Sequence, residues 1–167
     1  TIVLILVGSL SYLFFEYNNT LAGLPTEGKL ATALLGGVTP RTAGFNPTNI
    51  GMLSPTTLVI MLILMFIGAG PMSTGGGIKV TAMFVALAAT FNIMRNKRDV
   101  EVRGRRITTY TIRRSLAVIV VYLTWLMLAT IVLSWTEKGI PLFSLVFELV
   151  SALSTVGLSI NLSPLLS

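Results

Sequence analysis

Residues 66–79 read FIGAGPMSTGGGIK, and they interrupt a long apolar part of the chain. Apolar residues run from 54 to 66, and a mostly apolar pattern resumes from 78 to 94. Between them, residues 68–77 hold five glycines and one proline. Glycine costs a helix about 1 kcal/mol relative to alanine, and proline costs about 3 kcal/mol. The pattern therefore predicts a membrane helix that is broken at residues 68–77, here called the break.

The composition of the whole chain also indicates a membrane protein. Of the 167 residues, 53% are hydrophobic and 11% are charged, against about 25% charged in a typical soluble domain. Cysteine and histidine are absent, which excludes disulfides, thiol nucleophiles, Cys/His zinc sites and imidazole catalysis. No acidic pair is placed at membrane depth to act as acid and base, so we expect no enzyme, no catalytic residue and no cofactor. The chain opens inside an apolar run, and we expect it to be a fragment of a longer protein.

Two further apolar stretches have the character of membrane spans. Residues 1–15 carry no charge, and residues 116–134 form a complete uncharged span with Trp135 at its edge. Residues 29–38 and 141–153 are apolar but shorter than the roughly 20 residues that a crossing helix needs. They fit half-helices that enter the membrane and return to the same side.

Positive charge is concentrated between the break-containing helix and the last span. Eight of the twelve basic residues lie in residues 95–114: Arg95, Lys97, Arg98, Arg103, Arg105, Arg106, Arg113 and Arg114. A nucleic-acid interface would interleave aromatic residues, and only Tyr110 is present. The positive-inside rule therefore predicts a cytoplasmic loop at residues 95–115. The same residues also suit docking of anionic lipid or of a regulatory subunit.

With that loop inside, both half-helices begin outside and return outward, through residues 39–46 (the first return segment) and 154–159 (the second). The two segments align as Thr42-Ala43-Gly44 and Thr155-Val156-Gly157, at an offset of 113 residues. The repeated unit is a span, a half-helix, a Thr-x-Gly return and a span. Both units have the same orientation, which disfavours a solute transporter built from inverted repeats.

Thr-x-Gly in this setting suits the dehydration of a cation. An extended return segment can aim successive backbone carbonyls and a threonine hydroxyl at one axis, and glycine permits the backbone angles that this needs. The C-terminal end of each half-helix adds a dipole of favourable sign. The alternative for either copy alone is an ordinary turn.

These residues carry a family resemblance. Residues 40–46, 66–79 and 154–159 resemble, in order, three motifs of the Ktr/Trk/HKT superfamily of potassium transporters, and of these the bacterial Ktr-type membrane subunit most. The resemblance implies an all-α membrane protein whose pore is formed by four repeats of span, pore helix, filter and span. It implies that residues 1–94 are a third-type repeat, 95–115 a cytoplasmic loop and 116–167 a partial fourth-type repeat.

The resemblance also implies particular site residues. Ion-binding filter backbone would come from Thr42, Ala43, Gly44, Phe45, Thr155, Val156, Gly157 and Leu158. An intramembrane gate would comprise Gly68, Gly70, Pro71, Ser73, Thr74, Gly75, Gly76, Gly77 and Lys79. The break has a plainer alternative as a kink for packing, and Lys79 either repels cations in a closed state or snorkels.

Two charged residues beside the filter segments are expected to support them. Arg41 would oppose cation passage unless its guanidinium turns aside to bond carbonyls, so we interpret it as a structural brace. Glu148 precedes Thr155 by seven residues, and bracing of the filter backbone is preferred to direct ion binding.

The function expected from sequence is part of a potassium-selective uptake pathway in the plasma membrane, with potassium as substrate and sodium as the alternative ion. The competing hypothesis is a non-conducting membrane scaffold or assembly subunit. By resemblance, the full protein would be a homodimer in membrane lipid, regulated by a cytoplasmic nucleotide-binding subunit, with no nucleic-acid partner.

Overall fold

A computed structural model describes residues 1–41, 43–45, 48–71, 73, 75–95, 101–102, 105–137 and 139–160, the side chains of 101, 102 and 105 excepted. Six α-helices and two short 3-10 turns account for most of these residues. The elements are α1 (Ile2–Glu16), α2 (Thr26–Val38), η1 (Thr39–Arg41), η2 (Ile50–Met52), α3 (Pro55–Phe66), α4 (Val80–Met94), β1 (Glu101–Val102), β2 (Arg105–Arg106), α5 (Thr109–Thr136) and α6 (Leu142–Leu153). The predicted helical class is confirmed.

The structure differs from the sequence expectation around the basic loop. A two-stranded antiparallel ribbon pairs Glu101 with Arg106, which adds a short strand pair to the expected all-α fold. Helix α5 begins at Thr109, so residues 109–115, expected in the loop, are helical and continuous with the apolar part of α5. Arginine is a good helix former, so Arg113 and Arg114 extend the apolar helix rather than end it. In the described part of the chain, α5 alone is long and apolar enough to cross a membrane.

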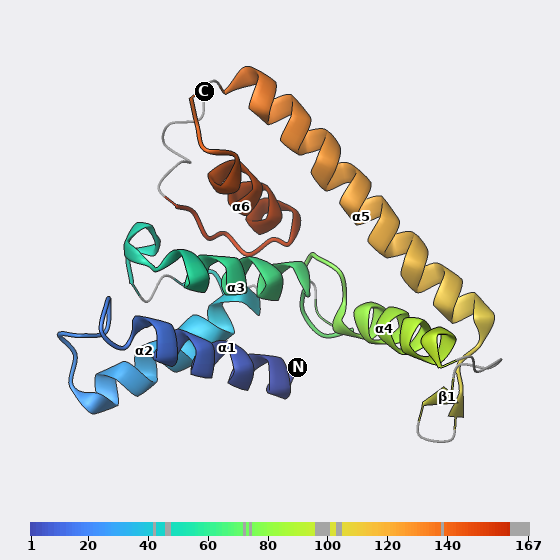
Figure 1. The fold of residues 1–167 in the computed structure, drawn as a ribbon, viewed down its shortest axis with the longest axis horizontal. Helices are drawn as coiled ribbons and strands as arrows, with labels where there is room; N and C mark the ends of the chain where they lie inside the picture. The colour runs from blue at the N-terminus through green and yellow to red at the C-terminus, as the bar shows by residue number, and fades with distance from the viewer. Residues whose placement is uncertain are drawn as a thin grey trace.

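Helices α1 and α2 pack closely against each other (Figure 1), and glycines lie at their contact. A Cβ placed on Gly8 would lie 3.2 Å from Cα of Gly37. A Cβ placed on Gly36 would lie 2.6 Å from the ring of Tyr12. Glycine at these positions lets the two backbones approach, a mode of helix packing typical of membranes.

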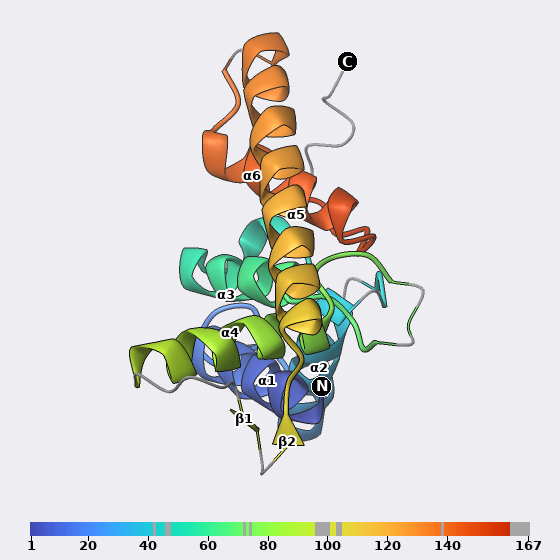
Figure 2. The same cartoon turned by 90° about the vertical axis from the view of Figure 1, so that its right-hand side faces the viewer.

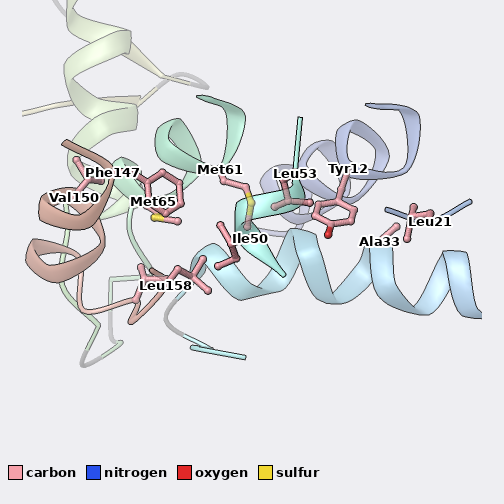
Figure 3. Packing of buried hydrophobic residues seen from close by; sticks show 11 residues of the cluster. Tyr12, Leu21, Ala33, Ile50, Leu53, Met61, Met65, Phe147, Val150 and Leu158 are labelled. Carbon is pink, nitrogen blue, oxygen red and sulfur yellow. The ribbon is translucent and has the colours of Figure 1, made fainter. Parts of the chain in front are cut away.

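Helix α3 lies between the α1–α2 pair and α6, and it joins them into one core (Figure 3). Its start is fixed by Ser54, whose Oγ accepts a hydrogen bond from the Thr57 backbone N–H at 3.3 Å, and by Pro55 at the first helical position. Buried Met61 and Met65 contribute from α3 to the central cluster. Its other members are Tyr12, Leu21, Ala33, Ile50, Leu53, Phe147, Val150, Val156 and Leu158.

Helix α5 packs against α6 along one part of its length and against α4 along another (Figure 2). Its contact with the α3 end is an edge-to-face pair of Phe66 and Tyr122, with ring centroids 5.3 Å apart. Large apolar side chains such as Trp125 and Met127 are more than half exposed on α5. In this arrangement the segment after α2 contacts the beginning of the break, and the segment after α6 contacts its end.

Candidate functional site

The two Thr-x-Gly segments lie against each other. Gly44 has a φ of +69° and Gly157 a φ of +81°, so both glycines adopt the left-handed conformation that a side chain disfavours. A Cβ on Gly44 would lie 3.2 Å from the carbonyl oxygen of Val156. The first and second return segments therefore approach each other through backbone atoms, with their glycines in matching conformations.

A hydroxyl group holds each return segment, from the first residue of the segment itself in one case and from α6 in the other. Thr39 Oγ1 donates to the carbonyl oxygen of Phe45 at 2.9 Å. Ser151 Oγ accepts from the backbone N–H of Leu158 at 2.8 Å. Phe45 and Leu158 each follow the glycine of their Thr-x-Gly, so the two anchors hold equivalent points. Neither hydroxyl is among the site residues predicted from sequence, although each stands near the C-terminal end of a half-helix.

The predicted filter residues differ in their exposure to solvent. Val156 and Leu158 are buried, Ala43 is half-buried, and Gly44, Phe45, Thr155 and Gly157 are exposed. Thr42 lies outside the described residues. A pocket of about 200 Å³ opens beside the second return segment. It is lined by Glu148, Ser151, Ala152, Gly157, Leu158 and Ser159.

Glu148 holds the far end of the second return segment. Its Oε1 accepts hydrogen bonds from Ser159 Oγ at 2.5 Å and from the Ile160 backbone N–H at 3.0 Å. These contacts attach Ser159, the last residue of the segment, and the following Ile160 to α6. Such contacts are consistent with the predicted role of Glu148 as a brace of the filter backbone.

Arg41 joins the first return segment to the beginning of the break. The side chain is 9% exposed, and Nη1 donates to the carbonyl oxygens of Ile67 at 3.2 Å and Gly68 at 3.1 Å. The guanidinium charge is thus directed at backbone carbonyls that the broken helix leaves without helical partners. This placement fits the expected brace.

The break forms a loop that is closed at its base. The Gly68 N–H donates to the Ile78 carbonyl at 2.9 Å, and the Ile78 N–H donates to the Phe66 carbonyl at 3.3 Å. Gly77 has a φ of +74°, a left-handed conformation that glycine supplies. The helical ladder is therefore replaced by a short parallel bridge between residues 67 and 78.

Lys79, the residue after the base of this loop, binds two carbonyl groups of the loop. Its Nζ donates to the carbonyl oxygens of Ser73 at 2.7 Å and Gly75 at 2.5 Å. Neither contact was predicted from the sequence. Of the other predicted gate residues, Gly70 and Pro71 lie along the loop, Gly76 contacts the second return segment, and Thr74 lies outside the described residues.

Glu16, a buried carboxylate that was not among the predicted site residues, connects the end of α1 to its neighbours. Glu16 has no exposed surface, and its Oε1 accepts from the Ser54 N–H at 2.8 Å and from Thr57 Oγ1 at 2.7 Å. Its Oε2 accepts from Asn19 Nδ2 at 2.8 Å and from Thr20 Oγ1 at 3.0 Å. Glu16 therefore fixes the start of α3 to the end of α1. A carboxylate at the end of an apolar span, followed by polar residues, was the available signal.

Replacement of Glu16 by glutamine is expected to destabilise the protein by about 3 kcal/mol, because an amide nitrogen cannot accept from donors that the carboxylate satisfies. The melting temperature of the purified full-length protein in detergent measures this loss. The control is Glu27→Gln, a change at an exposed carboxylate in the first turn of α2. Equal melting temperatures for the two variants would contradict a structural role for Glu16.

Comparison with known proteins places this chain in a family. Residues 2–163 match the TrkH family, which is described as a cation transport protein family. The chain belongs to the TrkH family. This confirms the resemblance to the Ktr/Trk group, and it confirms that the chain is not an enzyme but a member of a transport family. Membership also places this TrkH-family chain in a membrane.

Several proteins are similar in sequence to this TrkH-family chain over nearly all of its length. The chain is 40% identical over 169 residues to Ktr system potassium uptake protein B of Vibrio alginolyticus, covering 100% of this chain and 37% of that protein. It is 39% identical to the Ktr system potassium uptake protein B of Bacillus subtilis, covering 98% and 37%. It is 35% identical to the potassium/sodium uptake protein NtpJ of Enterococcus hirae, again covering 98% and 37%. The chain thus spans little more than a third of the length of these relatives.

Proposed function

We propose that this TrkH-family chain forms part of a potassium-selective uptake pathway, with the two Thr-x-Gly segments as filter backbone. The observation that carries the proposal is their juxtaposition, with Gly44 and Gly157 both left-handed and Gly44 against the Val156 carbonyl. Carbonyl oxygens in such segments replace the water of a cation. The potassium uptake names of the relatives support potassium as the substrate, and the potassium/sodium name keeps sodium as the alternative ion.

The ends of the two half-helices add to the same site. Helix α2 ends at Val38 and α6 at Leu153, each directly before its return segment. The negative end of a helix dipole stabilises a cation within about the last turn. In this proposal α1 and α5 are outer spans, α2 and α6 are pore helices, and α3 with α4 is the broken inner span.

In the same proposal, residues 1–94 and 116–167 are two repeats of one multi-pass plasma-membrane protein. Residues 95–115 face the cytoplasm, and the break is an intramembrane gate below the filter. The full protein is a homodimer that binds a nucleotide-binding regulatory subunit. The designation "Ktr system" in the names of two relatives suits a membrane component with other subunits.

Potassium uptake by the full-length protein in cells that lack their own uptake systems tests this proposal. A conducting protein restores growth at low external potassium and takes up a rubidium tracer above the empty-vector level. A scaffold restores neither while it remains in the membrane. Absence of tracer uptake from cells with confirmed membrane protein would favour the scaffold.

Glu148→Gln tests whether Glu148 braces the filter or binds the ion. Loss of the carboxylate charge weakens the hydrogen bonds from Ser159 and Ile160 by about 1 kcal/mol, and we expect potassium-over-sodium selectivity to fall by about fivefold. Ion affinity, measured by titration of potassium uptake, is expected to stay within about twofold, since 0.4 kcal/mol corresponds to that factor. Intact selectivity together with lost affinity would instead make Glu148 an ion ligand.

A further inference from the structure

We infer that Gly76 of the break positions the second filter segment, so that the break sets ion selectivity as well as passage. This inference rests on the proposed function, since it concerns the same filter. Its starting point is Thr155, the one residue other than glycine with a positive φ in the described part of the chain, at +54°. For a β-branched residue this conformation is an outlier that the surrounding structure must hold in place.

Backbone contacts hold one side of this strained turn. The Thr155 N–H donates to the Ala152 carbonyl at 3.0 Å, and the Val156 N–H donates to the Ser151 carbonyl at 2.9 Å. Both partners belong to the last turn of α6. The other side of Thr155, its side chain, is held from outside the repeat: the Gly76 N–H donates to Thr155 Oγ1 at 2.8 Å.

Gly76 makes this bond because its backbone lies directly on the turn. A Cβ on Gly76 would lie 2.6 Å from the Leu153 carbonyl oxygen, 3.0 Å from the Ser154 carbonyl carbon and 3.1 Å from Thr155 Cγ2. No side chain fits in that space without moving the break away from the turn. The identity of residue 76 and the conformation of Thr155 are therefore linked by contact.

The neighbouring residues reinforce the same junction. A Cβ on Gly77 would lie 3.1 Å from Ser154 Oγ, and that hydroxyl is hydrogen bonded to Tyr122 OH at 2.9 Å. At the opposite end of the break, Arg41 bonds the Ile67 and Gly68 carbonyls. Both return segments are thus attached to the break, one through Arg41 and one through Thr155. A displacement of the break reaches the filter backbone through these bonds.

The test compares two glycine-to-alanine changes, one in the break and one outside it, in the full-length protein reconstituted in lipid vesicles. In Gly76→Ala the methyl group forces the break off the turn, and we expect the potassium-to-sodium permeability ratio to fall by about tenfold, as about 1.4 kcal/mol of lost discrimination requires. Gly23→Ala is the control, because Gly23 lies between α1 and α2, outside the break and both return segments, and no atom lies within 4 Å of a Cβ placed on it. Its ratio is expected to equal that of the wild type.

Changes at Thr155 separate this coupling from general damage. Thr155→Val keeps the shape and removes the acceptor oxygen, whereas Thr155→Ser keeps the oxygen and is expected to preserve the ratio. Combining Gly76→Ala with Thr155→Val should lower selectivity no further than the larger single effect. Both changes remove the same hydrogen bond, from the Gly76 N–H to Thr155 Oγ1. If Gly76→Ala fails to assemble, the Val and Ser variants decide the matter.

Wild-type selectivity for Gly76→Ala, equal ratios for Thr155→Val and Thr155→Ser, or additive effects in the double variant would each overturn the inference. These results would leave the proposed function standing, provided that the wild type still prefers potassium. A wild-type protein that carries no potassium would instead refute the proposed function itself.

Discussion

Substitution of Gly157 by serine is expected to reduce the potassium-to-sodium permeability ratio of the full-length protein by at least about tenfold, while the protein remains in the membrane. Gly157 has a φ of +81°, and a left-handed backbone costs a residue with a Cβ about 1–2 kcal/mol. The chain relieves that strain by rotating the peptide units beside it. Since those units carry the carbonyls proposed to face the ion, the spacing of the ligands changes with them.

Gly139 provides a matched control for this substitution. Its φ is +98°, and as with Gly157 no atom lies within 4 Å of a Cβ placed on it. It lies in the connection between α5 and α6, outside both return segments. Gly139→Ser therefore introduces comparable strain, and its permeability ratio is expected to match the wild type. Similar selectivity losses in the two variants would mean that strain alone, and not the filter position, explains the effect.

Deletion of residues 72–76 is expected to raise potassium flux by about tenfold, because it removes a loop proposed to obstruct the path and tenfold corresponds to about 1.4 kcal/mol of barrier. The loop is closed at residues 67 and 78, so the deletion shortens it without removing the bridge at its base. Rubidium flux into vesicles measures the rate. Selectivity should weaken in the same variant, since Gly76 is lost.

Lys79→Met gives a milder version of the same experiment. Methionine has an unbranched side chain of similar length, but it lacks the ammonium group that donates to the Ser73 and Gly75 carbonyls. We expect flux between that of the wild type and the deletion. An unchanged rate in the deletion variant would reject the gate and leave the break as a kink for packing.

Much of the fold follows from local sequence. The apolar stretch at residues 1–15 predicts α1, and the glycines and proline of residues 68–77 predict the end of α3 and the start of α4 close to where they occur. The start of α5 was less accessible, because Arg113 and Arg114 are compatible with a loop as well as with a helix end. The ribbon of β1 and β2 has no alternating apolar pattern from which it could be predicted.

The site was predictable to the extent that it depends on single residues. Glycine at positions 44 and 157 indicates unusual backbone angles, and both are left-handed. The contacts of Lys79 and the hydroxyl anchors of Thr39 and Ser151 depend on where distant backbone atoms lie, which no local pattern encodes. The role of Glu16 could not be predicted from local sequence either, because two of its partners, Ser54 and Thr57, are distant in the chain.

The most direct test of the shared ion path is the flux of potassium and of sodium through purified full-length protein in vesicles, for the wild type, Gly44→Ser and Gly157→Ser. The two segments meet where Gly44 lies against the Val156 carbonyl. A shared ion path predicts potassium-selective flux for the wild type and loss of that preference in each variant. Equal selectivity in all three proteins, or wild-type flux no greater than that of empty vesicles, would contradict it.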